Sequence, residues 1–129
     1  MGFVAMIHSA PFSVNESLER VWSLARKCEG IPMVAVGALA SWENTQAIAD
    51  NNGGPANLSY DLTGLATTWD LAALVASGCT NRLVFGSGGP RFLPGLLRIA
   101  DACKLDPAVR EAILSGNAIR MFGLTGDPS

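Results

Sequence analysis

The feature that most constrains the fold is a repeated order of a short apolar run followed by a helical segment. Four apolar runs begin near residues 3, 32, 57 and 82. One unit therefore takes about 25 to 29 residues, the length of a strand plus a crossover helix. Such units predict parallel strands joined by right-handed crossovers. The sequence thus predicts an α/β fold of four consecutive βα units, either in a doubly wound open sheet or as half of an eight-stranded barrel.

Turn and capping residues set the expected boundaries of the elements. Strands are predicted at 3–8, 33–36, 57–62 and 82–85, each followed by a helix. The first strand is apolar at successive positions, so we expect it to be buried on both faces. Ser13 and Glu16 have the spacing of a capping box for the first helix. Trp42 is expected on the inner face of the second helix, and Ser115–Gly116 is expected to end the last long helix.

Charge and cysteine content exclude several classes of function. A net charge of −2 gives no electrostatic reason to expect nucleic acid or an acidic membrane as partner. No apolar run reaches the roughly 18 residues of a membrane span, and the apolar start lacks the basic region of a signal peptide. Three separated cysteines and one histidine exclude a zinc finger. We expect reduced thiols in a cytoplasmic protein.

Length and composition indicate one domain, 1–129, with a thin polar shell. The 129 residues suffice for one core, and 49% of them are hydrophobic while only 16% are charged. A parallel sheet with open edges would leave apolar surface that so few charges cannot cover. We therefore expect self-association, or pairing with another barrel segment.

The candidate site residues stand at the carboxyl ends of the strands, where both architectures bind ligands. His8, the only histidine, ends the first strand; it is either structural or a ligand or acid–base group. Asp61 ends the third strand, as a catalytic carboxylate or as a cap for the amides of Thr63 and Gly64. The loop 86–89 could present N–H groups to an anion, although it lacks the lysine of a P-loop.

Two segments near the end of the chain resemble a known family. Residues 82–90 read RLVFGSGGP, and residues 110–124 read REAILSGNAIRMFGL. They are similar to the last strand, R-[IL]-[LV]-F-G-S-D-x-P, and the closing helices of amidohydrolase-related barrel proteins, which include metal-dependent hydrolases and related decarboxylases. Segment 6–9 resembles the fifth strand of that family, and segment 57–61 its seventh. The resemblance covers the second half of the barrel and implies a divalent metal such as zinc, with His8 at a family ligand position.

The departures from this pattern concern the metal ligands. Gly88 stands where the family has the acid of its G-S-D signature, and the histidine that ends the sixth strand falls near Gly37. The paired histidines of the first strand lie outside this chain. Because a catalytic zinc needs about three protein ligands, we expect this chain alone to hold no metal and to be partial or degenerate.

Three functional hypotheses follow. The first is an enzyme half of hydrolase type that binds a small-molecule substrate once the missing strands are supplied. The second is a non-catalytic assembly or binding module that keeps the fold. The third is an unrelated doubly wound domain that binds a small anion at its glycine loop. Strand order separates the third from the others, because an open doubly wound sheet rearranges the sequential order.

Overall fold

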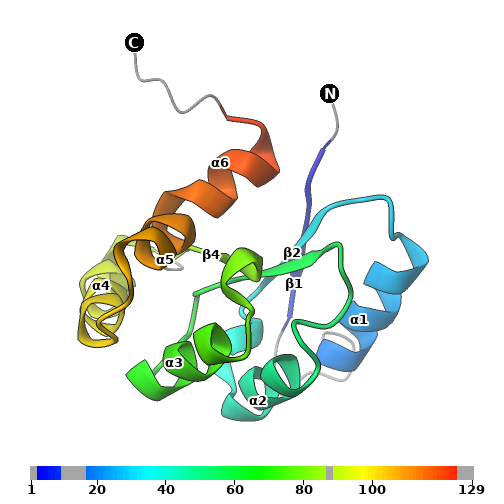
Figure 1. Cartoon of the computed structure of the whole chain (residues 1–129). Coiled ribbons are helices and arrows are strands. Elements are labelled where there is room, and N and C mark those ends of the chain that lie inside the picture. Colours follow the sequence, from blue (N-terminus) through cyan, green and yellow to red (C-terminus); the bar gives the residue numbers. More distant parts are fainter. Residues whose placement is uncertain (1–2, 10–16, 87–88, 125–129) are drawn as a thin grey trace.

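The chain forms a parallel sheet whose strands lie in sequential order. A computed structural model describes residues 3–9, 17–86 and 89–124. The four strands of this part pair in the order β1-β2-β3-β4, and every pair is parallel (Figure 1). Their bounds are β1 (Ala5–His8), β2 (Met33–Val36), β3 (Leu58–Asp61) and β4 (Leu83–Val84). The predicted four βα units are confirmed, and the described strands lack the rearranged order of a doubly wound sheet.

Helices follow each strand and lie in an arc around the strands (Figure 1). Ser17, Ser41 and Thr67 begin three of these helices, because each side-chain oxygen accepts a hydrogen bond from the backbone N–H three residues later. The predicted capping box of Ser13 and Glu16 lies outside the described residues. The helices are α1 (Leu18–Lys27), η1 (Ala38–Ala40), α2 (Trp42–Asp50), α3 (Thr68–Ala76), η2 (Thr80–Arg82), η3 (Pro90–Phe92), α4 (Leu93–Ala102), α5 (Pro107–Glu111), η4 (Ala112–Gly116) and α6 (Asn117–Phe122).

The hydrophobic core lies between the helices and one face of the sheet. Alternate strand residues point into it, because successive side chains of a strand face opposite sides. The strand residues of the core, with those packed against it, are Ala5, Ile7, Met33, Ala35, Leu58, Tyr60 and Leu83. The other face carries Met6, His8, Val34, Ser59, Asp61 and Val84. This face is the one that carries the candidate site residues.

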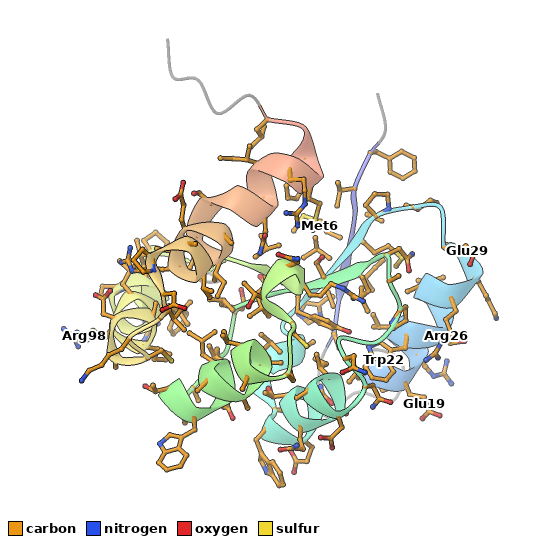
Figure 2. All side chains as sticks on the ribbon, viewed as in Figure 1. Met6, Glu19, Trp22, Arg26, Glu29 and Arg98 are labelled. Carbon is orange, nitrogen blue, oxygen red and sulfur yellow. The ribbon has the colours of Figure 1, made fainter. Side chains whose placement is uncertain are left out.

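Two predictions about burial were wrong. The first strand is not buried on both faces, since Met6 is 61% exposed (Figure 2). Because β1 is an edge strand with only β2 beside it, the side chains on its face opposite the core remain exposed. Trp42 is 64% exposed rather than inward. The inner face of α2 is centred on the buried Thr45 and Ile48, and Trp42 stands in the first turn, away from that face.

The amino edge of the sheet is held by side chains that bind backbone carbonyls. Arg82, just before β4, donates from Nη1 to the carbonyls of Gly53, Pro55 and Leu58 at 3.0, 2.8 and 2.6 Å, and from Nη2 to that of Gly54 at 3.2 Å. Asn57, just before β3, donates to the carbonyls of Ala25, Cys28 and Ile31 at 2.9–3.0 Å. Apart from the Leu58 carbonyl, which belongs to β3, these carbonyls lie in turns or near the end of α1, where polar side chains supply hydrogen-bond donors.

A further side-chain bridge joins α1 to β3. The indole N–H of Trp22 donates to the Tyr60 hydroxyl at 2.8 Å, and that hydroxyl donates to the Gly53 carbonyl at 2.8 Å. Tyr60 is fully buried, and this burial raises the pKa of its phenol strongly. The phenol therefore stays a neutral hydrogen-bonding group in the folded chain.

The last helical segment does not stop at Ser115–Gly116, contrary to the prediction. A π-helical turn, η4, joins α5 to α6, and Gly116 keeps helical backbone angles of −57° and −44°. The widened turn places Asn117 inward, where it is 0% exposed and donates to the carbonyls of Thr80 and Leu83, both at 2.7 Å. The turn thus positions the side chain that ties α6 to the start of β4.

Two further observations concern membrane-spanning helices and the cysteines. No helix in the described ranges combines the length and hydropathy needed to cross a bilayer. Cys28, Cys79 and Cys103 are all free thiols, and Cys79 is buried.

Replacing Asn117 by alanine should destabilise the fold substantially. The Asn117→Ala variant leaves two carbonyls at the start of β4 without their donor, and an unpaired buried polar group costs about 1–3 kcal/mol. We expect the free energy of unfolding to fall by about 2–4 kcal/mol in urea titrations followed by circular dichroism.

Asn51→Ala is the matched control. Asn51 also donates to a carbonyl, that of Ala47 at 2.7 Å, but it is exposed to water. Its loss should cost less than about 1 kcal/mol. Equal effects of the two substitutions would show that the Asn117 contacts are not buried anchors.

Candidate functional site

The candidate site lies at the carboxyl edge of the sheet. Parallel pairing brings the ends of all four strands to this edge, and the register sets His8 beside Val36 and Asp61 beside Val84. The residues that follow β2 and β4 are Gly37 and Gly86. His8, Gly37, Asp61 and Gly86 therefore occupy one edge, as the sequence predicted for strand ends.

Asp61 is the centre of this edge. It is 8% exposed, and its Oδ1 accepts a hydrogen bond from the Gly37 N–H at 3.2 Å. Its Oδ2 accepts from the Thr63 hydroxyl at 2.6 Å. The sequence predicted a cap for the amides of Thr63 and Gly64; the structure adds the Thr63 hydroxyl and an amide, that of Gly37, from the end of the neighbouring strand. The carboxyl group thus ties the ends of β2 and β3 together.

Gly37 is required by its surroundings. Its φ of +88° lies in the left-handed region, and a Cβ built there would lie 2.9 Å from the Ser9 carbonyl oxygen. The same Cβ would lie 4.0 Å from His8 Nε2. The position where the family resemblance places a histidine is therefore next to the imidazole, but here it supplies only a backbone N–H to Asp61.

Gly86 gives the Asp61 carboxylate room at the end of β4. A Cβ at this position would lie 2.8 Å from Asp61 Oδ2, well inside normal contact distance. Any larger residue would have to displace the carboxylate from its partners. The glycines after β2 and β4 thus both serve the placement of one acidic side chain.

Burial raises the pKa of Asp61 above its ordinary value of 3.8. The Thr63 hydroxyl, the Gly37 and Thr63 amides and the charge of His8 offset part of this effect, because each favours the carboxylate. A buried carboxyl group with a raised pKa, at an edge of the sheet that also carries an imidazole, is suited to proton transfer.

The edge does not supply a set of metal ligands. Among the described residues, no three His, Cys, Asp or Glu side chains lie together in a way that could hold an ion. Gly88, where the family has its acid, lies outside the described residues. His8 and Asp61 would fall short of the about three protein ligands of a catalytic zinc. The residues present do not fit the family's metal site.

The structure thus places both side chains that the sequence singled out at one edge, and it adds the Gly37 amide, the Thr63 hydroxyl and the close approach of Gly86 to Asp61. The bond from the Gly37 amide and the close approach at Gly86 could not be predicted from the sequence, since both depend on the register between strands. The contact of Asp61 with the Thr63 hydroxyl could have been predicted from the sequence, because Thr63 stands two residues after Asp61 in a turn.

Comparison with known proteins gives likenesses of fold. No known family model and no curated protein matches the sequence. Among solved structures, a 2,6-dihydroxybenzoate decarboxylase in complex with 2,6-dihydroxybenzoate is similar, with a TM-score of 0.63 and 17% identity over 84% of this chain and 40% of its own. A 5-carboxyvanillate decarboxylase from Sphingomonas paucimobilis has a TM-score of 0.62 and 13% identity over 85% and 40%.

These likenesses show that the chain shares its fold with part of both proteins, in agreement with the half-barrel that the sequence predicted. The chain spans about 40% of the length of both decarboxylases. Four successive parallel βα units therefore recur in both larger proteins.

The burial of Asp61 should appear in the pH dependence of stability. The folded pKa is raised, so between pH 3.8 and that raised pKa the folded state binds more protons than the unfolded state. The free energy of unfolding contributed by Asp61 therefore falls as pH rises through this window. Asp61→Asn removes this term, so the variant should gain stability relative to the wild type between pH 4 and 7 in urea titrations.

Asp106→Asn provides the control, because Asp106 is exposed and makes no side-chain capping bond. Its stability difference from the wild type should stay nearly constant over the same pH range. A pH-independent difference for Asp61→Asn would contradict a buried, ionising carboxyl group at position 61.

Proposed function

We propose that this chain is the second half of an amidohydrolase-related barrel and acts on a small carboxylated substrate when further strands complete the ring. The observation that carries this proposal is the position of His8 and Asp61 at one carboxyl edge, where the Gly37 N–H binds Asp61 and a Cβ at Gly37 would lie 4.0 Å from His8 Nε2. Enzymes built on parallel barrels place their reacting groups at this edge. The remaining strands would come from another barrel segment or from a second copy.

The two similar structures suggest the class of substrate. Both are named as decarboxylases of aromatic carboxylates. In such a reaction the bond between the ring carbon and the carboxylate breaks, carbon dioxide leaves, and the ring carbon takes up a proton. Asp61, whose raised pKa keeps it protonated to higher pH than an ordinary carboxyl group, is a suitable donor. Hydrolase chemistry, the other activity of the resembling family, would use the same pair for proton transfer to a leaving group.

The steps proposed here are limited to this chain's own residues. His8 and Asp61 do not reach the number of ligands that a catalytic zinc needs, so the steps assigned here use only these two groups and proton transfer. A site with fewer ligands is also what a partial or degenerate relative would carry.

The open edge strand favours completion by another chain. In the described sheet, β1 pairs only with β2. The side chain of Met6 in this strand is 61% exposed, and that of Phe3 just before it is 69% exposed. An unpaired strand edge with apolar side chains is a template for pairing with another strand. A non-catalytic assembly module would use the same edge, so the second hypothesis differs from the first only in ligand binding.

A charge on the edge strand should disrupt both assembly and ligand binding. We expect the wild-type chain to associate at micromolar concentration in light scattering, and Met6→Lys to shift it toward monomer. The associated form should bind 2,6-dihydroxybenzoate with a change in the NMR signal of the His8 ring, which is unambiguous because the chain has one histidine. Met6→Lys and Asp61→Asn should both lose this change.

Leu24→Lys is the control for the edge substitution. Leu24 is 42% exposed on α1, away from the strand edge. It should leave association and the ligand response unchanged. A wild-type chain that stays a stable monomer would contradict completion by a second copy. Association without any ligand response would favour the assembly module.

A further inference from the structure

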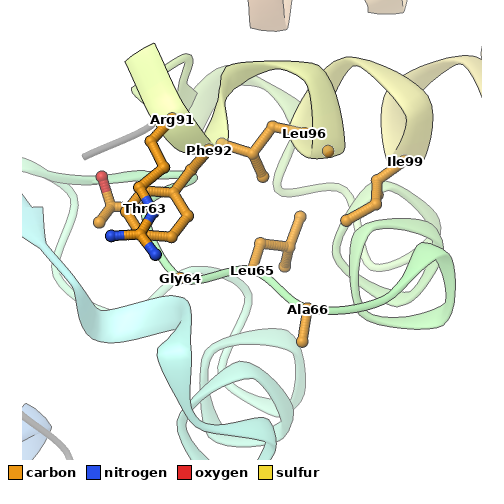
Figure 3. Close-up of a pocket in the computed structure, with 9 residues that line it drawn as sticks. Thr63, Gly64, Leu65, Ala66, Arg91, Phe92, Leu96 and Ile99 are labelled. Carbon is orange, nitrogen blue, oxygen red and sulfur yellow. The ribbon is translucent and has the colours of Figure 1, made fainter. Parts of the chain in front are cut away.

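A cavity of about 620 Å³ lies between the loop after β3 and helix α4. Figure 3 shows Arg91 and Phe92 at one end and Ile99 at the other, with Leu65 and Leu96 between them. Sites for small molecules have volumes of about 300–1,000 Å³, so this cavity is large enough for a ligand. It is formed by described residues of this chain and needs no further strands.

The walls of the cavity are apolar apart from two side chains. Leu65 and Leu96 are each 5% exposed and belong to the hydrophobic core. Thr63 lines one side, but its hydroxyl proton already goes to Asp61 Oδ2 at 2.6 Å. No acidic side chain is among the described residues that line the cavity. An apolar wall without a carboxylate suits an apolar ligand.

Arg91 supplies the one charge of this cavity. Its guanidinium carbon lies 5.6 Å from the centre of the Phe92 ring. The described part of the chain offers it no ion pair, in contrast to Arg110, which binds Asp101 at 3.0 Å. A guanidinium presents paired N–H donors that match a carboxylate. The charge of the cavity therefore complements a single carboxylate.

Gly95, which lines the cavity, is a second feature that leaves space for a ligand. It lies inside α4, where glycine is less favourable than alanine. Its backbone is helical, and a Cβ built there would meet no atom within 4 Å. Neither the conformation nor the packing of this chain therefore requires a glycine. Its lack of a side chain instead keeps the cavity wall open next to Arg91.

We propose that this cavity binds a medium-chain carboxylic acid, with the carboxylate on Arg91 and the apolar chain along Leu65, Leu96 and Ile99. The proposal goes beyond the function proposed for His8 and Asp61, because it names a second site, lined by neither of them. It also holds for the monomer, since β1 and its open edge take no part in it.

The test is NMR titration of the full chain with octanoate, 1-octanol and octylammonium. These share one apolar chain and differ in charge. Octanoate should shift the amide signals of Gly64 and Gly95 and bind about tenfold tighter than the alcohol, the range of one charge-assisted hydrogen-bonded pair. Octylammonium should bind least. Arg91→Gln should remove the preference for the acid, and Gly95→Leu should abolish binding of all three by filling the space.

Arg98→Gln is the matched control, since Arg98 lies on the same helix and points to solvent (Figure 2). It should leave the affinities unchanged. Met6→Lys should also retain octanoate binding, which separates this site from the proposed assembly. Equal affinity for acid and alcohol in the wild type, or no binding, would overturn the proposal. Undiminished binding to a folded Gly95→Leu variant would do the same. If that variant does not fold, the Arg91→Gln comparison decides.

Discussion

The contacts of the Arg82 guanidinium with four backbone carbonyls are the interaction on which the rest of the sheet depends. They fix the turn 53–58 to the start of β4, and so set how β3 lies against β4. The register that results places Asp61 beside Val84, with Gly86 next to its carboxylate. Without this guanidinium, carbonyls in a part-buried turn would lose their donor, at a cost of about 1–3 kcal/mol each when buried. The contacts of Arg82 at the amino edge thus help to set where Asp61 and Gly86 lie at the carboxyl edge.

The amino edge of the sheet carries contacts that stabilise the fold, while the carboxyl edge carries the candidate site. Parallel barrels commonly show this division. Arg82 and Asn117 are among the residues that carry the family resemblance, and both bind carbonyls at the amino edge. Arg120, another residue of that pattern, donates to the Asn81 carbonyl at 3.3 Å. The segments that carry the resemblance therefore stabilise the fold at the amino edge. The resemblance in these segments therefore indicates the architecture, while the candidate site residues lie at the opposite edge.

The order of strands and helices could be predicted from the sequence, because apolar runs and capping residues are local signals. His8 and Asp61 could be predicted as site residues because both end a strand of a parallel sheet. The hydrogen bond from Gly37 to Asp61 could not, since it requires the register between β2 and β3. The exposure of Met6 also escaped prediction, because an edge strand and a central strand have similar apolar sequences. The continuous helix through Gly116 was missed because glycine is a common stop signal, whereas here the need to place Asn117 inward prevails.

The carboxyl edge of this half-barrel carries His8 and Asp61, and under the proposed function other strands supply the rest of a catalytic site. Gly37 contributes an amide where a ligand would stand, so the edge holds His8 and Asp61 but no third donor among the described residues. Equilibrium dialysis of the chain against zinc, followed by elemental analysis, measures this most directly. A half-site of two side chains should retain well under one zinc per chain, because catalytic sites use about three protein ligands. Near-stoichiometric zinc in the wild type that His8→Ala abolishes would contradict the account and show that the chain holds a complete metal site.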